Sequence, residues 1–193
     1  MTEAHALETP PGGIAVPAGG WTVDQLDTWP ESHVRYELTD GALTVSPSPS
    51  SLHQAVSGRL YVQLDDVAAT GLAVTQAVEI RFGHQLTRIP DLLVVRSDDP
   101  VRHWFAPAEV LLAVEIESPG SHAEDRVMKP ALYARHGIPH FWRIGFEPIR
   151  VRRYRLGSGD TYREAGSSDE RLTTQEPFAV DVALTDLLPR WAR

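Results

Sequence analysis

The sequence predicts a mixed α/β (α+β) fold in which a sheet is flanked by helices. Apolar residues recur at helical spacing in two stretches, and short strand-like runs rich in valine, leucine and isoleucine lie before, between and after them. The 193 residues are enough for one domain with a core of its own and hardly enough for two. We therefore expect a flexible tail at residues 1–20 and a single domain at residues 21–193.

The tail is predicted from two clusters of proline and glycine, at residues 10–13 and 17–20. Directly after it, Thr22 can cap a short helix. The apolar side of that helix would be formed by Val23, Leu26 and Trp29.

A hairpin and a long helix are expected next. The Asp40-Gly41 dipeptide separates two alternating runs, which favours a tight β-hairpin. Ser50 or Ser51 can then cap a helix, because apolar residues recur at helical spacing over residues 52–69. Gly71 is expected to end this helix.

Strand-like runs occupy much of the remaining chain. Strands are expected at residues 73–82, 89–95, 110–116, 139–144, 149–156 and 160–165, and a short helix at residues 184–188. The run at 110–116 begins with five consecutive apolar residues, as is typical of a central strand buried on both faces.

A second helix is expected between the third and fourth of these strands. It should run to about His136 and end at Gly137. Pro130 lies inside it and predicts a kink or a new helix start there, because proline cannot donate the backbone hydrogen bond of a helix interior.

The overall composition excludes some classes of protein. Cysteine is absent, so disulfides and thiolate metal sites are excluded. No run approaches the roughly 20 apolar residues that span a bilayer, and the N-terminus does not resemble a secretory signal. We therefore expect a cytoplasmic protein without membrane contacts.

The charge distribution is uneven. The net charge of −8 has the wrong sign for binding nucleic acid through the overall field of the protein. Between Arg126 and Arg155, however, eight basic residues stand against one acidic residue, a local charge of +7. Candidate nucleic-acid contacts in this segment are Arg143, Arg150, Arg152 and Arg153. Alternation along a strand would send them to both faces, and a solvated edge strand is the alternative interpretation.

Two carboxylates are placed at strand ends. Asp91 follows Pro90 and opens one apolar run, whereas Glu115 closes the next. If the two strands are neighbours, the carboxylates can share one end of the sheet. Mg²⁺ takes one or two protein carboxylates and leaves other positions to water and phosphate. Such an ion can activate water and offset charge on a phosphoryl group.

Pro90-Asp91 and Glu115-Ile116-Glu117 resemble the signature of PD-(D/E)XK nucleases. More closely, the chain resembles the bacterial Uma-two family of restriction endonucleases. The matching stretches cover about residues 22–188 and comprise 36–41, 46–47 with 53–54, 90–95, 114–119, 125–133 and 137–142. The resemblance implies a restriction-endonuclease-like core of helix, three strands, helix and strand, with an added N-terminal hairpin and C-terminal strands.

The resemblance also implies a metal-dependent endonuclease that acts on DNA with Mg²⁺, or with Mn²⁺ in its place. Asp91 and Glu115 would bind the metal, helped by the backbone carbonyl of Ile116. Glu117 occupies the position where the superfamily lysine usually stands, so Lys129, the only lysine in the chain, would take that role from the following helix. Double-strand cleavage would favour a homodimer.

Several residues keep alternative interpretations. Glu37 is a candidate further metal ligand, or it orients a bound water. His53 could face phosphate, hydrogen-bond Glu37, or only cap or pack its helix. Glu117 could support the metal ligands or be a solvated strand end, and Lys129 could simply pair with Asp125. The alternative function is a catalytically silent DNA-binding or interaction module on the same fold, and a third possibility is hydrolysis of another phosphoester.

Overall fold

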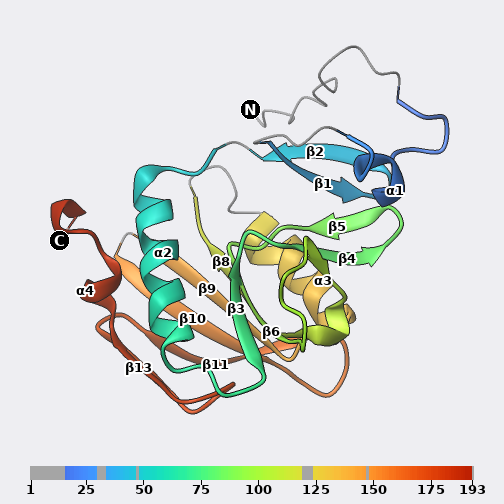
Figure 1. The fold of residues 1–193 in the computed structure, drawn as a ribbon. Coiled ribbons are helices and arrows are strands. Elements are labelled where there is room, and N and C mark those ends of the chain that lie inside the picture. The colour runs from blue at the N-terminus through green and yellow to red at the C-terminus, as the bar shows by residue number, and fades with distance from the viewer. Residues whose placement is uncertain (1–15, 30–33, 47, 119–123, 147, 193) are drawn as a thin grey trace.

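The computed structural model describes residues 16–29, 34–46, 48–118, 124–146 and 148–192. It is built around a six-stranded mixed sheet with the strand order β11-β10-β9-β8-β6-β3. Helix α2 covers one face of this sheet and α3 the other (Figure 1). The predicted mixed α/β fold is therefore confirmed, whereas the first 15 residues of the expected tail lie outside the described residues.

The centre of the sheet is β8 (Val110–Ile116), which is buried along its whole length. It pairs in antiparallel fashion with β6 (Leu92–Arg96) and in parallel with β9 (His140–Phe146). The outer strands are β3 (Leu72–Gln76) beside β6, and β10 (Ile149–Leu156) and β11 (Tyr162–Ser168) beyond β9. Burial on both faces explains the continuously apolar run in the sequence.

Helix α2 (Ser51–Asp65) begins as expected, with the Ser50 side chain accepting a hydrogen bond from the His53 backbone. Its apolar face packs against the sheet through Val56, Leu60 and Leu64. The helix ends four residues earlier than expected. Asp65 and Asp66 stand at its C-terminus, where negative charge opposes the helix dipole.

The expected strand at 73–82 is wrong as one element. It is divided at Ala77, whose φ of 54° places it in the left-handed region and turns the chain out of the main sheet. The second half forms β4 (Glu79–Gly83), which belongs to a separate three-stranded sheet with β5 (Leu86–Arg88) and β7 (Trp104–Phe105). A 3-10 turn at Pro107–Glu109 then leads into β8.

The second helix begins at the proline, which confirms a new helix start there, one of the two predicted alternatives. A π-helical turn (Glu124–Met128) precedes α3 (Lys129–Arg135), and Pro130 occupies the first turn of α3. Gly137 follows with a φ of 77° and ends the helix.

The N-terminal hairpin is confirmed. Helix α1 (Val23–Leu26) is capped by Thr22, and β1 (Arg35–Thr39) pairs with β2 (Ala42–Ser46). Asp40 and Gly41 both have positive φ, which is the conformation of a type I′ hairpin turn. The hairpin lies over the end of the sheet at which β6 begins (Figure 1).

The C-terminal segment contains a hairpin that the sequence did not predict, formed by β12 (Arg171–Thr174) and β13 (Val180–Ala183). It is followed by α4 (Leu184–Leu187), close to the expected range, and a 3-10 turn (Arg190–Ala192). Apolar side chains of this segment complete the core beneath α2. None of the helices described is long and apolar enough to span a lipid bilayer.

Candidate active site

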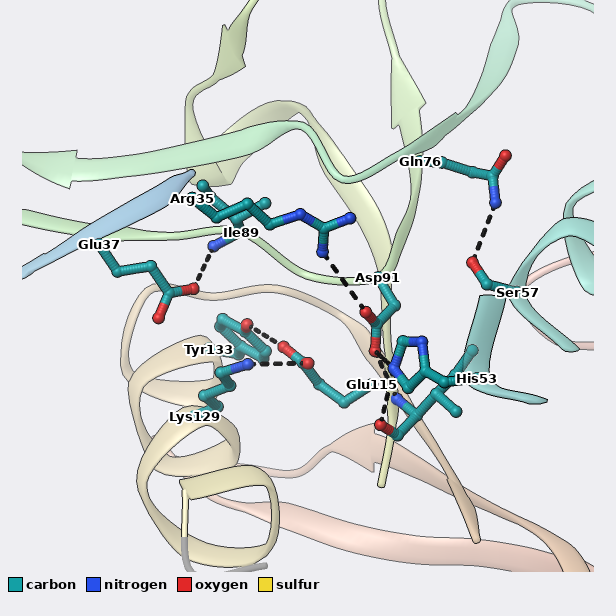
Figure 2. A network of polar contacts seen from close by, with 11 residues as sticks. Arg35, Glu37, His53, Ser57, Gln76, Ile89, Asp91, Glu115, Lys129 and Tyr133 are labelled. Atoms are coloured by element: carbon teal, nitrogen blue, oxygen red, sulfur yellow. Dashed lines mark hydrogen bonds and ion pairs between the residues drawn. The ribbon is translucent and has the colours of Figure 1, made fainter. Parts of the chain in front are cut away.

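Asp91 and Glu115 meet at one end of the main sheet. The β6–β8 register pairs Leu92 with Val114, so Asp91 and Glu115, the next residues outward, are neighbours across the two strands. They nevertheless belong to two adjoining polar networks (Figure 2).

The first network surrounds Asp91, whose side chain is only 11% exposed. Its Oδ2 accepts a hydrogen bond of 2.8 Å from the backbone N–H of Ile116. Its Oδ1 lies 3.9 Å from Nη1 of Arg35, which reaches over from β1 (Figure 2). The carboxylate is therefore fixed against the end of β8.

His53 joins this network from the first turn of α2. Its Nε2 lies 3.1 Å from Oδ2 of Asp91 and 3.1 Å from the carbonyl oxygen of Ile116. Because both neighbours are acceptors, Nε2 carries the proton here and donates to both. Nδ1 is buried and has no hydrogen-bond partner among the described residues. His53 thus contacts Asp91, and not Glu37 as one interpretation of the sequence had it.

The second network surrounds Glu115, which is buried on the α3 face. Its Oε2 lies 2.9 Å from Nζ of Lys129, and its Oε1 accepts a 2.6 Å hydrogen bond from the hydroxyl of Tyr133. Lys129 and Tyr133 are four residues apart and therefore share one face of the helix. These two partners offset the cost of burying the carboxylate. The alternative pairing of Lys129 with Asp125 involves a side chain outside the described residues.

Tyr133 is fitted to donate to Glu115. Its ring is completely buried between the sheet and Phe82. Burial, followed by the negative charge of Glu115, raises the pKa of the phenol well above its usual value. The hydroxyl therefore stays protonated and holds Glu115 in one orientation.

Glu37 approaches the same region from β1. It is 6% exposed, and its Oε1 accepts a 2.6 Å hydrogen bond from the backbone N–H of Ile89. Figure 2 shows its carboxylate on the side of the Glu115 network. Its two predicted roles, ligation of a metal or the orientation of a water, stay predictions.

Glu117 is buried at 9% exposure and so is not a solvated strand end. Arg126 donates two hydrogen bonds of 2.9 Å to its two oxygens, and Nε of Arg143 lies 2.9 Å from Oε1. Glu117 therefore fixes two arginines beside the Glu115 network.

The candidate nucleic-acid residues divide between the two faces of the sheet. The register places Arg143 beside Glu115 and Arg152 beside Arg143, so a row of residues runs from the carboxylate across β9 and β10. By alternation Arg150 lies on this face too, where it pairs with Asp169 at 3.3 Å. Arg153 lies opposite Trp142 and faces the other way. Strand β10 lies between β9 and β11, so the interpretation as a solvated edge strand is wrong.

Two residues of the site were not identified from the sequence, Arg35 and Tyr133. Arg35 stands two residues before Glu37 and must share its face of β1. Tyr133 stands one turn after Lys129. Spacing from the candidates already chosen could have found both.

The chain is similar to a protein family and to a solved structure. The sequence model of the Uma2 family, described as "Putative restriction endonuclease", matches residues 23–186. A crystal structure of a "putative nuclease belonging to DUF820" from Anabaena variabilis superposes with a TM-score of 0.70 at 20% identity, covering 89% of this chain and 99% of that chain. At this identity the likeness shows the fold alone. No curated protein matches the chain.

Proposed function

Because the chain belongs to the Uma2 family, whose model describes restriction endonucleases, we propose that it is a metal-dependent endonuclease that hydrolyses phosphodiester bonds in DNA. The observation that carries the proposal is the meeting of Asp91 and Glu115 at one sheet end, with the buried cation of Lys129 on Glu115. Buried charge of this kind is expensive to maintain for stability alone.

The donor atoms fit a divalent ion such as Mg²⁺ or Mn²⁺. Asp91 and Glu115 supply two carboxylates and Ile116 a carbonyl, which are the oxygen ligands that these ions take. No cluster of three acidic or histidine side chains is preformed among the described residues, so water and phosphate would complete the coordination. When bound, the ion would supply an activated water and offset charge on the scissile phosphate.

The remaining residues have roles that follow from their contacts. Lys129 holds Glu115 and brings a compact positive charge to the edge where a phosphate would enter. Tyr133 fixes the orientation of Glu115. Glu37 would accept a proton from a water or orient it. Arg35 is 37% exposed beside Asp91 and can contact a phosphate oxygen.

DNA is the proposed partner because the basic row is continuous with the site. Arg143 and Arg152 extend from Glu115 across the sheet, and Arg126 and Arg150 lie on the Glu117 side of this row. Phosphates bound along this row would present one bond to the carboxylates, despite the net charge of −8. A cut through both strands would need two such sites, so we expect a homodimer on DNA.

Cleavage of supercoiled plasmid by the purified chain tests the proposal. Nicked or linear DNA should appear with Mg²⁺ or Mn²⁺ and disappear with EDTA. Asp91→Asn and Glu115→Gln should each abolish cleavage, whereas Asp65→Asn, on the exposed end of α2, should cut normally. DNA binding without cleavage under all these conditions would identify a silent binding module instead.

A further inference from the structure

The geometry points to His53 as a direct ligand of the divalent ion through Nε2, in a site that selects Mn²⁺ over Mg²⁺. The inference rests on the proposed function only in requiring that an ion binds beside Asp91. It adds a ligand that the family signature of carboxylates does not contain, and with it the identity of the preferred metal.

The spacing of the donor atoms is that of ligands on one ion. Nε2 of His53 lies 3.1 Å from Oδ2 of Asp91 and 3.1 Å from the carbonyl oxygen of Ile116. Adjacent ligands of an octahedral ion with bonds of about 2.1 Å are separated by about 3.0 Å. The two distances from Nε2 therefore match those between adjacent ligands, and the ion would take the place of the proton that Nε2 shares with the two oxygens.

The environment holds His53 in this position. Its side chain is 9% exposed, and its backbone N–H is bonded to the Ser50 cap at the start of α2. The ring is therefore aimed at the two oxygens from a fixed helix end, which limits the rotamers that it can adopt.

Conversion to a ligand requires a change of tautomer. Nε2 must offer its lone pair, so the proton of the neutral ring moves to Nδ1. Nδ1 is buried and has no hydrogen-bond partner among the described residues, so its N–H would need a water as acceptor.

An imidazole ligand changes which metal ion the site binds most tightly. Imidazole suits transition metals, whereas carboxylate, carbonyl and water oxygens suit Mg²⁺ and Mn²⁺ alike. Mg²⁺ also demands near-ideal geometry and dehydrates reluctantly. Adding one imidazole nitrogen to the protein oxygens of the site should therefore make it bind Mn²⁺ more tightly than Mg²⁺, by about tenfold or more.

Metal binding to the full chain, freed of metal with EDTA and then dialysed, tests the inference without measuring activity. Titration calorimetry with MnCl₂ and MgCl₂ should give the tighter binding for Mn²⁺. His53→Asn should weaken Mn²⁺ binding by about tenfold or more and leave Mg²⁺ binding much less affected. His84→Asn is the matched control, because His84 is 82% exposed at the turn after β4 and should leave both affinities unchanged.

Pulsed electron paramagnetic resonance of bound Mn²⁺ decides the matter even if His53→Asn fails to fold. The native chain should show nitrogen-14 modulation from a directly bound imidazole, and Asp91→Asn should remove that bound ion. Bound Mn²⁺ without nitrogen modulation, or no bound Mn²⁺, would overturn the inference. So would a His53→Asn variant that binds both ions as tightly as the native chain or more tightly, since His53 would then only occupy the place of the ion. Nitrogen-coupled Mn²⁺ in a chain that never cuts DNA would support the ligand and refute the proposed function.

Discussion

The hydrogen bond from Tyr133 to Glu115 can be measured by removing one oxygen atom. Tyr133→Phe deletes the hydroxyl that donates to Glu115 at 2.6 Å and keeps the buried ring. A hydrogen bond to a charged group contributes about 1.5–3 kcal/mol, whereas one between neutral groups contributes about 0.5–1.5 kcal/mol. Loss of the larger amount should lower the melting temperature of a chain of this size by about 3–12 °C.

A matched control lies in the same aromatic cluster. The hydroxyl of Tyr162 donates to the neutral carbonyl of Ile138 at 2.8 Å, and its ring stacks on Phe141, which Tyr133 also contacts. Tyr162→Phe should therefore cost only the smaller amount. Urea unfolding followed by tryptophan fluorescence gives both free energies on one scale.

The charge of Glu115 must account for the difference between the two tyrosines. In a Glu115→Gln background the acceptor is neutral, so Tyr133→Phe should then cost no more than Tyr162→Phe. Such a double-mutant cycle isolates the coupling between neighbouring residues. Equal costs for the two tyrosines in the native background, or an unchanged cost of Tyr133→Phe beside Gln, would refute the assignment of Tyr133 to the orientation of an ionised Glu115.

Three further predictions concern other parts of the chain. Lys129→Arg keeps a positive charge beside Glu115 but replaces a compact ammonium with a planar guanidinium. DNA cleavage should therefore fall by about 100-fold or more while Mn²⁺ affinity is retained. Near-native cleavage would leave Lys129 with no role beyond its ion pair with Glu115. Arg150→Ser combined with Arg152→Ser should weaken DNA binding and reduce the magnitude of the slope of log affinity against log salt concentration by about 1.8. Arg153→Ser, on the other face, should leave the slope unchanged. Equal slopes for the native chain and the double variant in filter binding would contradict the role of the basic row in DNA binding. Burial lowers the pKa of His140, so the folded state resists protonation of this side chain. The free energy of unfolding should therefore fall as the pH drops below about 6.5. His140→Gln should reduce this pH dependence of the free energy of unfolding, measured with urea at several pH values.

Much of the fold follows from local signals. The continuously apolar run at Val110–Ile116 is typical of a buried strand, and the Asp40-Gly41 dipeptide is typical of a hairpin turn, so the sequence predicts both elements. The division at Ala77 has no such signal, because alanine rarely adopts a positive φ, and Val74 and Thr75 before it and Val78 after it favour a continuous strand. The strands at Arg171–Thr174 and Val180–Ala183 are four residues each, too short for periodicity to distinguish them from loop.

Some residues of the candidate site could likewise be predicted from the sequence, and others could not. Asp91 and Glu115 could be chosen because carboxylates at strand ends are conspicuous in the sequence. The contact of His53 with the Ile116 carbonyl joins residues 63 positions apart and depends on a backbone atom, which has no signature in the sequence. The sequence therefore identifies charged residues at strand ends more readily than a contact with a distant backbone atom.

Glu117 explains why the lysine of this site comes from a helix. It lies just beyond the end of β8, two residues after Glu115, and its backbone N–H bonds to the Ile144 carbonyl, so its side chain faces the same side of the sheet as Glu115. A lysine there would lie against Arg126 and Arg143, which Glu117 now holds by ion pairs. Like charges in contact are destabilising, so a strand lysine and this pair of arginines exclude each other. With the arginines beside the end of the sheet, the cation that pairs with Glu115 comes from another element. Lys129 lies in the first turn of α3, and its Nζ is 2.9 Å from Oε2 of Glu115.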